Sequence, residues 1–424
     1  IIRKKIKMKF IGIVNFKKFK FNFIILMIIA GLNAILYLIL FTQCLKPSIM
    51  YYKLLADFDQ QNDFLRSDKR SSDDRITKFI LFYTPFFGNL NWYLPKTTND
   101  QQFFMQNNCS ISNCVLTSNR SLLPHIHEFD ALIFHIAAPW THSLLDKVPA
   151  TRDRNQIYIA FNMESPAHTK HELKYDNDFY NWTMTYRLDS EILSPYGDIW
   201  DKRASTILHP PIKQWLNLHE NFSDKMLLDK VKRKTKLAAM FASHCDVHSK
   251  RDRLVKSLQN FIPVDVFGEC GNLTCERGSS KCDQLLNTDY KFYFAFENSL
   301  CRDYITEKLY HSMQAFIVPV VFGGAIYSQF IPPHSYIDAN DYGTPRELAD
   351  YLLYLNENPE EYLKYFWWKS YYEVRDNNYQ KYCDLCAKLH ATNLVYKSQF
   401  YQNIKAWWFQ DTCQSESRIK FLRN

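Results

Sequence analysis

Residues 292–324 join two apolar runs through a charged stretch, and they read FYFAFENSLCRDYITEKLYHSMQAFIVPVVFGG. The first run, Tyr293–Phe296, has the aromatic composition of a strand, and the second, Ala315–Phe322, ends at two glycines. Residues 303–314 between them have the length and composition of a helix. The stretch therefore predicts a β-α-β unit that holds a ligand at its helix.

Three polar residues of this expected helix are spaced to share one face. Tyr304, Glu307 and Lys308 stand at positions i, i+3 and i+4 near its N-terminus. There the helix dipole and the free backbone N–H groups favour an anion, such as a nucleotide diphosphate. The spacing alone is equally compatible with a solvated Glu-Lys pair on a surface helix.

The same stretch resembles the donor-binding motif of the α1,3-fucosyltransferases, glycosyltransferase family ten. That motif has the pattern F-x-F-E-N-S-x-x-x-D-Y-x-T-E-K followed by a V-P-V-V strand, and this sequence matches it from Phe294 to Val321. The resemblance implies that Glu297, Asn298, Tyr304, Glu307 and Lys308 bind the donor. It covers about residues 77–424.

The positive charge of the chain is concentrated at its N-terminus. Removing eight bases that precede residue 21 leaves 44 bases against 44 acids, so the excess of +8 is poor evidence for nucleic-acid binding. An uncharged stretch, 21–41, follows and is long enough to span a bilayer as a helix. Basic residues on its N-terminal side predict a cytoplasmic tail and a luminal remainder, that is, a type II membrane protein. The eight bases are Arg3, Lys4, Lys5, Lys7, Lys9, Lys17, Lys18 and Lys20.

The cysteines and glycosylation sequons agree with a luminal compartment. Ten cysteines follow Cys44, and an oxidising lumen favours disulfides among them, although the sequence does not give their connectivity. The spacing of Cys270, Cys275 and Cys282, and of Cys383 and Cys386, also resembles zinc ligand pairs, which are the alternative. Sequons stand at Asn108, Asn119, Asn181, Asn221 and Asn272.

The order of apolar runs predicts an α/β protein with two Rossmann-like domains facing a cleft, the GT-B type, an assignment that rests mainly on the family resemblance. Strands are expected at 77–83, 131–134, 157–161, 237–241 and 264–267, with a basic helix at 251–261 and helical structure over 345–365. The expected parts are a cytoplasmic tail (1–20), a transmembrane signal-anchor (21–42), a stem (43–75), an N-terminal acceptor domain (76–225), a C-terminal GDP-fucose-binding domain (226–390) and an extension packing on both domains (391–424).

Glu164 is the candidate general base. It lies in N-M-E-S-P, just past the carboxyl end of an expected strand, where α/β sites form. The resemblance places the base of the family at this position, and an acceptor hydroxyl needs such a carboxylate to remove its proton. The other interpretation is an acid that caps a helix before Ser165-Pro166. His168 and His171 nearby suggest a metal pair, but they have no third ligand in the sequence.

Two further segments resemble the family. The stretch 180–191 matches F-N-W-T-x-x-Y-R-x-D-S-D except for Tyr180 and Glu191, and Glu191 argues against a strict D-x-D metal site. Ala242-Ser243-His244-Cys245 resembles its S-N-C turn. Arg251 aligns best with the arginine that contacts the donor pyrophosphate, with Arg253 as the alternative; a planar guanidinium can bind two phosphate oxygens at once.

Taken together, the resemblance implies an inverting α1,3-fucosyltransferase of the Golgi membrane. It would move fucose from GDP-fucose to the 3-hydroxyl of a GlcNAc in a glycoprotein glycan, either the chitobiose core or an antenna. No obligatory metal is expected, because two cations already serve the diphosphate, and Mn²⁺ would at most stimulate. The alternatives are a catalytically inactive glycan-binding membrane protein of the same fold, or a related transferase with another sugar nucleotide.

Overall fold

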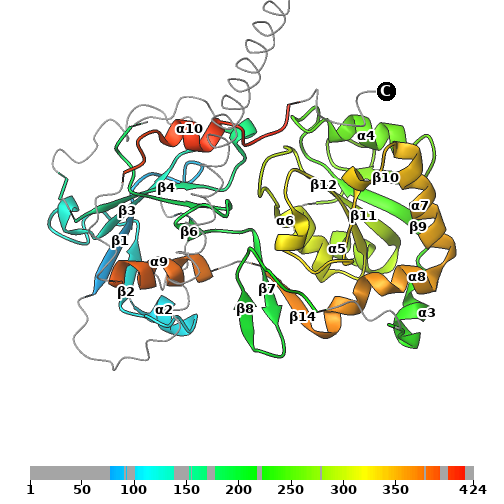
Figure 1. The fold of residues 1–424 in the computed structure, drawn as a ribbon, viewed down its shortest axis with the longest axis horizontal. Helices are drawn as coiled ribbons and strands as arrows, with labels where there is room; N and C mark the ends of the chain where they lie inside the picture. Colours follow the sequence, from blue (N-terminus) through cyan, green and yellow to red (C-terminus); the bar gives the residue numbers. More distant parts are fainter. Residues whose placement is uncertain are drawn as a thin grey trace, which may run out of the picture. The chain divides into compact units, whose positions relative to one another are not determined.

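Three β-sheets form the framework of the described chain (Figure 1). The structure is a computed structural model, and it describes residues 77–89, 92, 101–137, 152–153, 155–169, 177–216, 222–276, 279–376, 379–391 and 400–415. The expected tail, membrane segment and stem lie outside these ranges, as do Asn221 and His171. Among the described residues, no helix has the length and apolar character that a bilayer crossing requires.

The first sheet has six parallel strands in the order β2-β1-β3-β4-β5-β6. Its apolar side chains point to both faces, and both faces are covered. Helices α2 and α9 pack on one face and helix α10 on the other. The strands expected at 77–83, 131–134 and 157–161 are confirmed, because buried parallel strands read as continuous apolar runs. The elements are β1 (Lys78–Phe82), α2 (Gln102–Gln106), β2 (Cys114–Thr117), β3 (Ala131–His135), β4 (Ile157–Asn162), β5 (Trp182–Thr185), β6 (Ile192–Leu193), α9 (Gln380–His390) and α10 (Ile404–Phe409).

The second sheet has five parallel strands in the order β10-β9-β11-β12-β13. Helices α3, α4, α7 and α8 pack on one face, and α5 and α6 on the other (Figure 1). This arrangement confirms the α/β class. The elements are α3 (Lys225–Arg233), β9 (Lys236–Phe241), α4 (Arg251–Leu258), β10 (Val264–Phe267), α5 (Ser280–Thr288), β11 (Tyr290–Phe296), α6 (Glu307–Gln314), β12 (Val318–Phe322), β13 (Ile337–Asp338), α7 (Pro345–Glu357) and α8 (Pro359–Leu363).

A small antiparallel sheet, β14-β7-β8, was not expected from the sequence. It pairs β7 (Gly197–Asp201) and β8 (Thr206–Leu208), which follow the first sheet in the chain, with β14 (Tyr372–Asp376), which follows the second. Ile199 of β7 and Val374 of β14 belong to the same buried cluster as helix α6. The small sheet therefore connects both halves of the chain to the helix of the expected donor site.

Helix α9 belongs to the first sheet in space although the sequence places it in the expected C-terminal domain. Its buried residues Leu385 and Leu389 join the apolar cluster of β1–β5. Two disulfides, Cys109–Cys383 and Cys114–Cys386, bond it covalently to the segment after α2 and to the first residue of β2. The last helix of the expected range 226–390 thus packs on the sheet of the first half of the chain.

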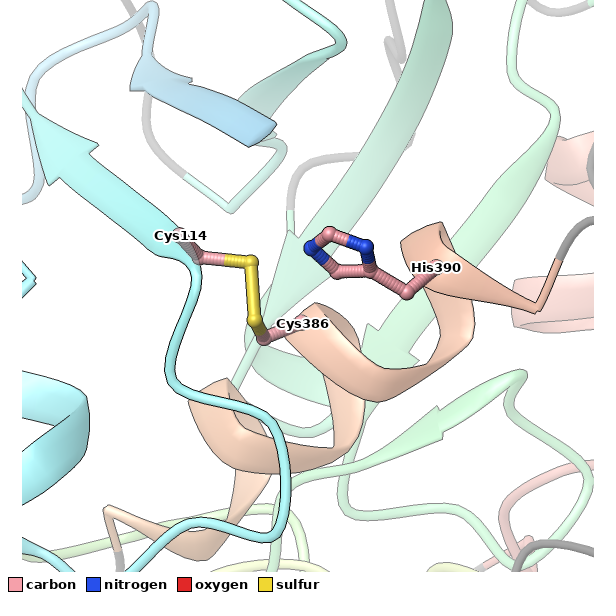
Figure 2. Close-up of side chains that lie close together, drawn as sticks. All are labelled: Cys114, Cys386 and His390. Atoms are coloured by element: carbon pink, nitrogen blue, oxygen red, sulfur yellow. A yellow bond between two sulfur atoms is a disulfide. The ribbon is translucent and has the colours of Figure 1, made fainter. Parts of the chain in front are cut away.

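The ten cysteines expected to form disulfides are all paired. The other three bridges are Cys245–Cys270, Cys275–Cys282 and Cys301–Cys413. Among the described residues, one group, Cys114, Cys386 and His390, has metal-ligand proximity, but its two sulfur atoms are bonded to each other (Figure 2). The cysteine pairs that resemble zinc ligands are thus disulfide cysteines in this fold.

Candidate active site

Glu297 lies at the carboxyl end of β11 and organises the start of helix α6. Its carboxylate is fully buried and accepts hydrogen bonds from the backbone N–H and the hydroxyl of Thr306, both at 2.8 Å. Thr306 is the N-cap of α6, and its side chain accepts from the N–H of Lys308. A buried carboxylate needs such donors to offset its lost hydration. Glu297 therefore fixes where the first turn of α6 begins.

The ammonium of Lys308 completes this cluster. Its Nζ lies 2.8 Å from the hydroxyl oxygen of Thr306, 3.4 Å from a carboxylate oxygen of Glu297 and 3.3 Å from one of Glu307. Burial acts to lower the pKa of Lys308, but the two carboxylates outweigh burial and raise that pKa, so the side chain is a cation. Glu307 is the more exposed partner, with 54% of its side chain accessible. Glu307 and Lys308 thus lie together at the helix N-terminus, as expected.

Tyr304 does not share the helix face predicted for it. Helix α6 begins at Glu307 rather than at Asp303, because Asp303 adopts the left-handed conformation with φ 61°, which an α-helix excludes. Tyr304 is 1% exposed, and its ring packs against those of Tyr186 and Tyr196 with centroids 5.0 and 6.3 Å away. Its ring forms part of an aromatic wall that also includes residues of the first half.

Arg251 is the first residue of α4 and is almost fully buried. Its guanidinium donates to the backbone carbonyls of Phe296, at 2.8 Å, and His244, at 3.0 Å. The Nε–H finds no hydrogen-bond partner among the described residues. Arg251 therefore holds the end of β11 against the loop after β9, while the alternative, Arg253, is exposed.

Asn298 lies in the same loop as Glu297. Its backbone carbonyl accepts the N–H of Ser249 at 2.9 Å, and its side-chain oxygen accepts the hydroxyl of Ser299 at 3.1 Å. Ser249 also donates its hydroxyl to the carbonyl of Glu297 at 2.6 Å. These bonds fix the loop after β11 to the start of α4. The predicted donor residues therefore gather at one edge of the second sheet, and Tyr304, although it is not part of the helix, lies near enough for the charges of Glu297 and Glu307 to add to the rise that burial causes in its pKa.

Glu164 follows β4 of the first sheet, and the structure brings it to the same place. Its N–H donates to the side-chain oxygen of Asn162 at 2.9 Å, which turns the chain after the strand. Burial raises the pKa of the half-buried Glu164 carboxyl, and the charge of Lys308 opposes that rise. The negative charges of Glu307 and Glu297 raise it further. The candidate base is therefore within electrostatic reach of the candidate donor cluster.

A direct hydrogen bond joins the two groups of residues. The hydroxyl of Ser165, next to the candidate base, donates to the hydroxyl of Ser299 at 2.8 Å, and both side chains are fully buried. Sequence reasoning missed this pair, although Ser299 belongs to the matched motif. It also missed Thr306, whose place just before a charged helix is an N-cap signal.

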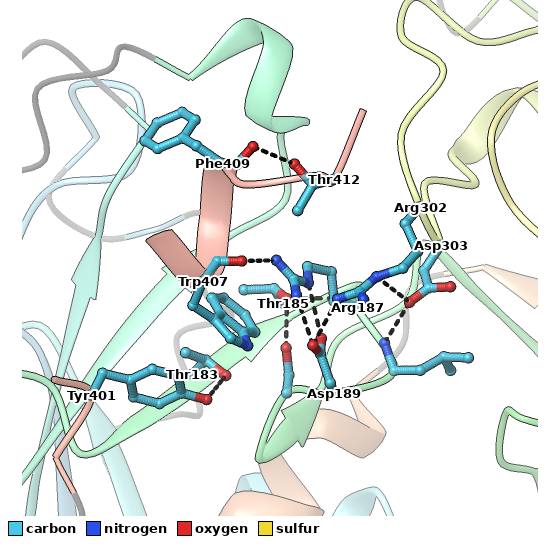
Figure 3. Close-up of polar contacts among 12 residues, drawn as sticks. Thr183, Thr185, Arg187, Asp189, Arg302, Asp303, Tyr401, Trp407, Phe409 and Thr412 are labelled. Carbon is cyan, nitrogen blue, oxygen red and sulfur yellow. Dashed lines mark hydrogen bonds and ion pairs between the residues drawn. The ribbon is translucent and has the colours of Figure 1, made fainter. Parts of the chain in front are cut away.

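The family-like segment 180–191 proves to be a structural hub (Figure 3). Asp189 accepts from Arg187 and from Arg302, each at 2.7 Å, while the N–H of Leu188 donates to Asp303. Arg187 also donates to the carbonyl of Trp407. The hub thus ties the first half of the chain, the loop after β11 and the C-terminal segment together.

The structure also locates two further residues noted in the sequence, Glu191 and His168. Glu191 accepts the N–H of Thr183 at 2.7 Å and the hydroxyl of Tyr401 at 2.9 Å, so its carboxylate supports β5. His168 ends the short 3-10 helix Pro166–His168, and partial desolvation of its ring together with the charge of His248 lowers its pKa. The metal interpretation of His168 rested on His171, which is outside the described residues.

Comparison with known proteins gives consistent matches over most of the chain. The model "Fucosyltransferase, N-terminal" matches residues 75–197, and "Glycosyltransferase family 10 (fucosyltransferase) C-term" matches 231–407. The chain is 42% identical over 365 residues to Alpha-(1,3)-fucosyltransferase C of Drosophila melanogaster, covering 85% of each protein. It is 33% identical over 321 residues to Alpha-(1,3)-fucosyltransferase fut-1 of Caenorhabditis elegans, covering 73% of this chain and 67% of that protein. A crystal structure of an α1,3-fucosyltransferase with GDP-fucose aligns with 15% identity and a TM-score of 0.44 over 79% of this chain and 95% of that one.

Proposed function

Because the chain belongs to the fucosyltransferases of glycosyltransferase family 10, we propose that it transfers fucose from GDP-fucose to the 3-hydroxyl of a GlcNAc residue with inversion at the anomeric carbon. The observation that carries this proposal is the placement of Glu164. The candidate base extends from one parallel sheet and the Glu297–Lys308 cluster from another, and the Ser165–Ser299 hydrogen bond holds them together.

The proposed reaction is one displacement. Glu164 takes the proton of the acceptor hydroxyl as that oxygen forms a bond to C1 of fucose. The bond from C1 to the diphosphate oxygen breaks, and its electron pair leaves with GDP. Lys308 is a cation next to the start of α6, where it would neutralise the charge that develops on the leaving group. Loss of one such contact typically costs about 3–4 kcal/mol.

The other candidate residues would have supporting roles. Glu307 is exposed enough to meet the sugar ring and stabilise its developing positive charge. Arg251 would use its Nε–H, which has no partner in the part of the chain that the structure describes, toward the pyrophosphate, because two of its other N–H groups serve the backbone. Tyr304 would form an aromatic wall of the site. Two cations suffice for the diphosphate, so no metal is obligatory in this proposal, with Mn²⁺ at most a stimulator.

We extend the proposal to the acceptor and the compartment. The acceptor is a GlcNAc of a glycoprotein glycan, in the chitobiose core or an antenna. The enzyme would be a type II protein of the Golgi membrane, anchored by 21–42 with its catalytic part in the lumen, because the basic tail precedes an apolar stretch and the folded part carries five disulfides.

The test uses the luminal part, from about residue 50, secreted from cells and incubated with GDP-fucose. The acceptors are a chitobiose-core glycopeptide and a terminal N-acetyllactosamine glycan, with the product linkage read by NMR. Transfer to the 3-hydroxyl of GlcNAc in either acceptor supports the proposal. Binding of GDP-fucose without transfer to any GlcNAc acceptor would favour a glycan-binding protein, and transfer from a different sugar nucleotide would favour a related transferase.

A further inference from the structure

A tyrosine that is distant in the sequence holds the turn that carries Glu164 in place, through a hydrogen bond to the residue before Glu164. The hydroxyl of Tyr196 donates to the backbone carbonyl of Met163. Tyr196 lies between β6 and β7. It is outside the turn after β4 that carries Glu164 and outside the loop and helix that follow β11. The hydrogen bond acts on the peptide that leads directly into Glu164, so it restrains where the carboxylate can lie.

Tyr196 is itself fixed relative to the donor helix. The next residue, Gly197, packs so closely on α6 that a Cβ there would lie 2.5 Å from the ring of Tyr310. Only glycine permits this approach. A short physical path therefore runs from α6 through Tyr310 and Gly197 to Tyr196, and from its hydroxyl to the peptide before Glu164.

The surroundings of Tyr196 keep its hydroxyl a donor. Burial raises the pKa of this phenol well above 10, and the charges of Tyr304 and Glu164 contribute to the rise. The ring of Tyr304 lies 6.3 Å from that of Tyr196 and 5.0 Å from that of Tyr186. The negative charge of Glu164 also raises the pKa of Tyr186 and Tyr304, so the carboxylate lies near all three phenols.

We propose that Tyr196 is a positioning residue for the carboxylate of Glu164, which it aligns with the donor helix through its hydrogen bond to Met163 and the contact of Gly197 with Tyr310. This inference rests on the proposed function, in which Glu164 is the base. Tyr196 acts through the backbone and takes no proton itself. A base displaced by about 1 Å loses up to roughly a hundredfold in rate, so the bond is expected to matter for turnover more than for donor binding.

The test is Tyr196→Phe, which removes the hydroxyl and keeps the ring. We expect kcat to fall by about tenfold to a hundredfold, while the KM for GDP-fucose stays within about twofold. Without this hydrogen bond the turn would expose Glu164 to more water, which lowers the pKa of its carboxyl. The acidic limb in a plot of kcat/KM against pH should therefore move to lower pH. A purely structural role would leave that limb in place.

The matched control is Tyr362→Phe. Tyr362 is a buried residue of α8 that likewise donates to a backbone carbonyl, that of Lys291 of β11 at 2.5 Å, and it lies away from Glu164. Both variants should lose similar stability in urea, and only Tyr196→Phe should change the kinetics. Equal kinetics for the two variants, or an unmoved acidic limb in Tyr196→Phe, would overturn the inference.

Glu164→Gln separates this inference from the proposed function. If the wild type transfers fucose and Glu164→Gln abolishes transfer while it still binds GDP-fucose, the proposed function is supported. The kinetics of Tyr196→Phe then test the positioning role of Tyr196 alone. Retained transfer in Glu164→Gln, or no fucose transfer by the wild type, would refute the assignment of the base and the role of Tyr196 with it.

Discussion

The hydroxyl of Ser165 donates to the hydroxyl of Ser299 at 2.8 Å, and this bond joins the turn of Glu164 to the loop that follows Glu297. The two serines are 134 residues apart in the chain, and both are fully buried. Each stands next to or within two residues of a carboxylate assigned to the site. The 2.8 Å distance between the two hydroxyl oxygens is therefore a direct constraint on how the candidate base faces the donor cluster.

Ser165→Ala removes that constraint. We expect kcat/KM to fall by about twofold to tenfold and the free energy of unfolding to fall by about 0.5–1.5 kcal/mol, the contribution of one hydrogen bond. The control is Ser335→Ala, which removes an equally buried hydroxyl that donates to Pro332 at 2.6 Å away from the site. Steady-state kinetics and urea unfolding of both variants test this. An identical kcat/KM for the two variants would contradict it.

Lys308→Met should destabilise the fold as well as weaken donor binding. It leaves the Glu297 carboxylate buried without its ammonium, which typically costs about 3–5 kcal/mol. Adding Glu297→Gln removes the unpaired charge, so the double variant should regain much of the stability but no transfer activity. Urea unfolding gives the stabilities, and calorimetric titration with GDP gives the affinities. Simply additive losses would show that the two side chains are not coupled.

The pH dependence of transfer should report the raised pKa of Glu164. A base must be unprotonated, so activity is lost as the pH falls through that pKa. Because burial raises the pKa of Glu164 above its ordinary value of 4.5, the acidic limb of kcat/KM should have its midpoint above 4.5. Profiles measured at saturating GDP-fucose in buffers of constant ionic strength test this. A midpoint at or below 4.5 would argue against Glu164 as the base.

The disulfide Cys301–Cys413 should contribute more stability than Cys275–Cys282. The first closes a loop with a sequence separation of 112 and the second a loop of 7. In the chain-entropy model the longer loop is worth about 2 kcal/mol more. Paired Cys→Ser variants of each bridge, unfolded in urea, measure the difference. Equal losses would mean that loop closure does not govern the effect here.

Asn181 should carry no glycan in the secreted protein, although it stands in a sequon. It is 8% exposed, and its side-chain oxygen accepts the N–H of Tyr158 at 2.8 Å and a bond from Arg152. A glycan is bulky and would be attached to the amide nitrogen of this buried side chain, which the folded structure leaves little room for. Asn108, Asn119 and Asn272 are exposed and provide the comparison. Glycopeptide mass spectrometry would contradict this prediction by finding Asn181 occupied in folded material.

Local features of the sequence were enough to predict three of the six strands of the first sheet, four of the five strands of the second sheet and the β-α-β unit. Runs such as 157–161 are apolar because both faces of a parallel strand are buried, and this signal needs no knowledge of the partner. The helical structure over 345–365, which forms α7 and α8, could be predicted because one face of that stretch is apolar. The gathering of Glu307 and Lys308 at a helix N-terminus also followed from local spacing.

The sequence was misleading where distant contacts decide the conformation. Tyr304 has helical spacing to Glu307, yet Asp303 is left-handed and its carboxylate accepts the N–H of Leu188 from the other half. Alignment predicts that Arg251 binds the pyrophosphate, a role it keeps in the proposed function, but alignment could not show its bonds to two backbone carbonyls, which come from tertiary packing. The packing of α9 on the first sheet and the pairing of β14 with β7 join segments that are far apart in the sequence, and periodicity contains no information on such partners.

The bonding of α9 to the first sheet has a consequence for the synthesis of this protein. Cys109 and Cys114 are made 274 and 272 residues before their partners, Cys383 and Cys386. At about 5–20 residues per second, that delay is roughly 14–54 s. During that delay α9 is missing from its face of the β1–β5 sheet, and the thiols of Cys109 and Cys114 lack their partners while the cysteines at 245, 270, 275, 282 and 301 are synthesised. Correct maturation thus depends on keeping early thiols from pairing with the wrong partners, which makes thiol-exchange catalysts and holding chaperones part of the requirements for this fold.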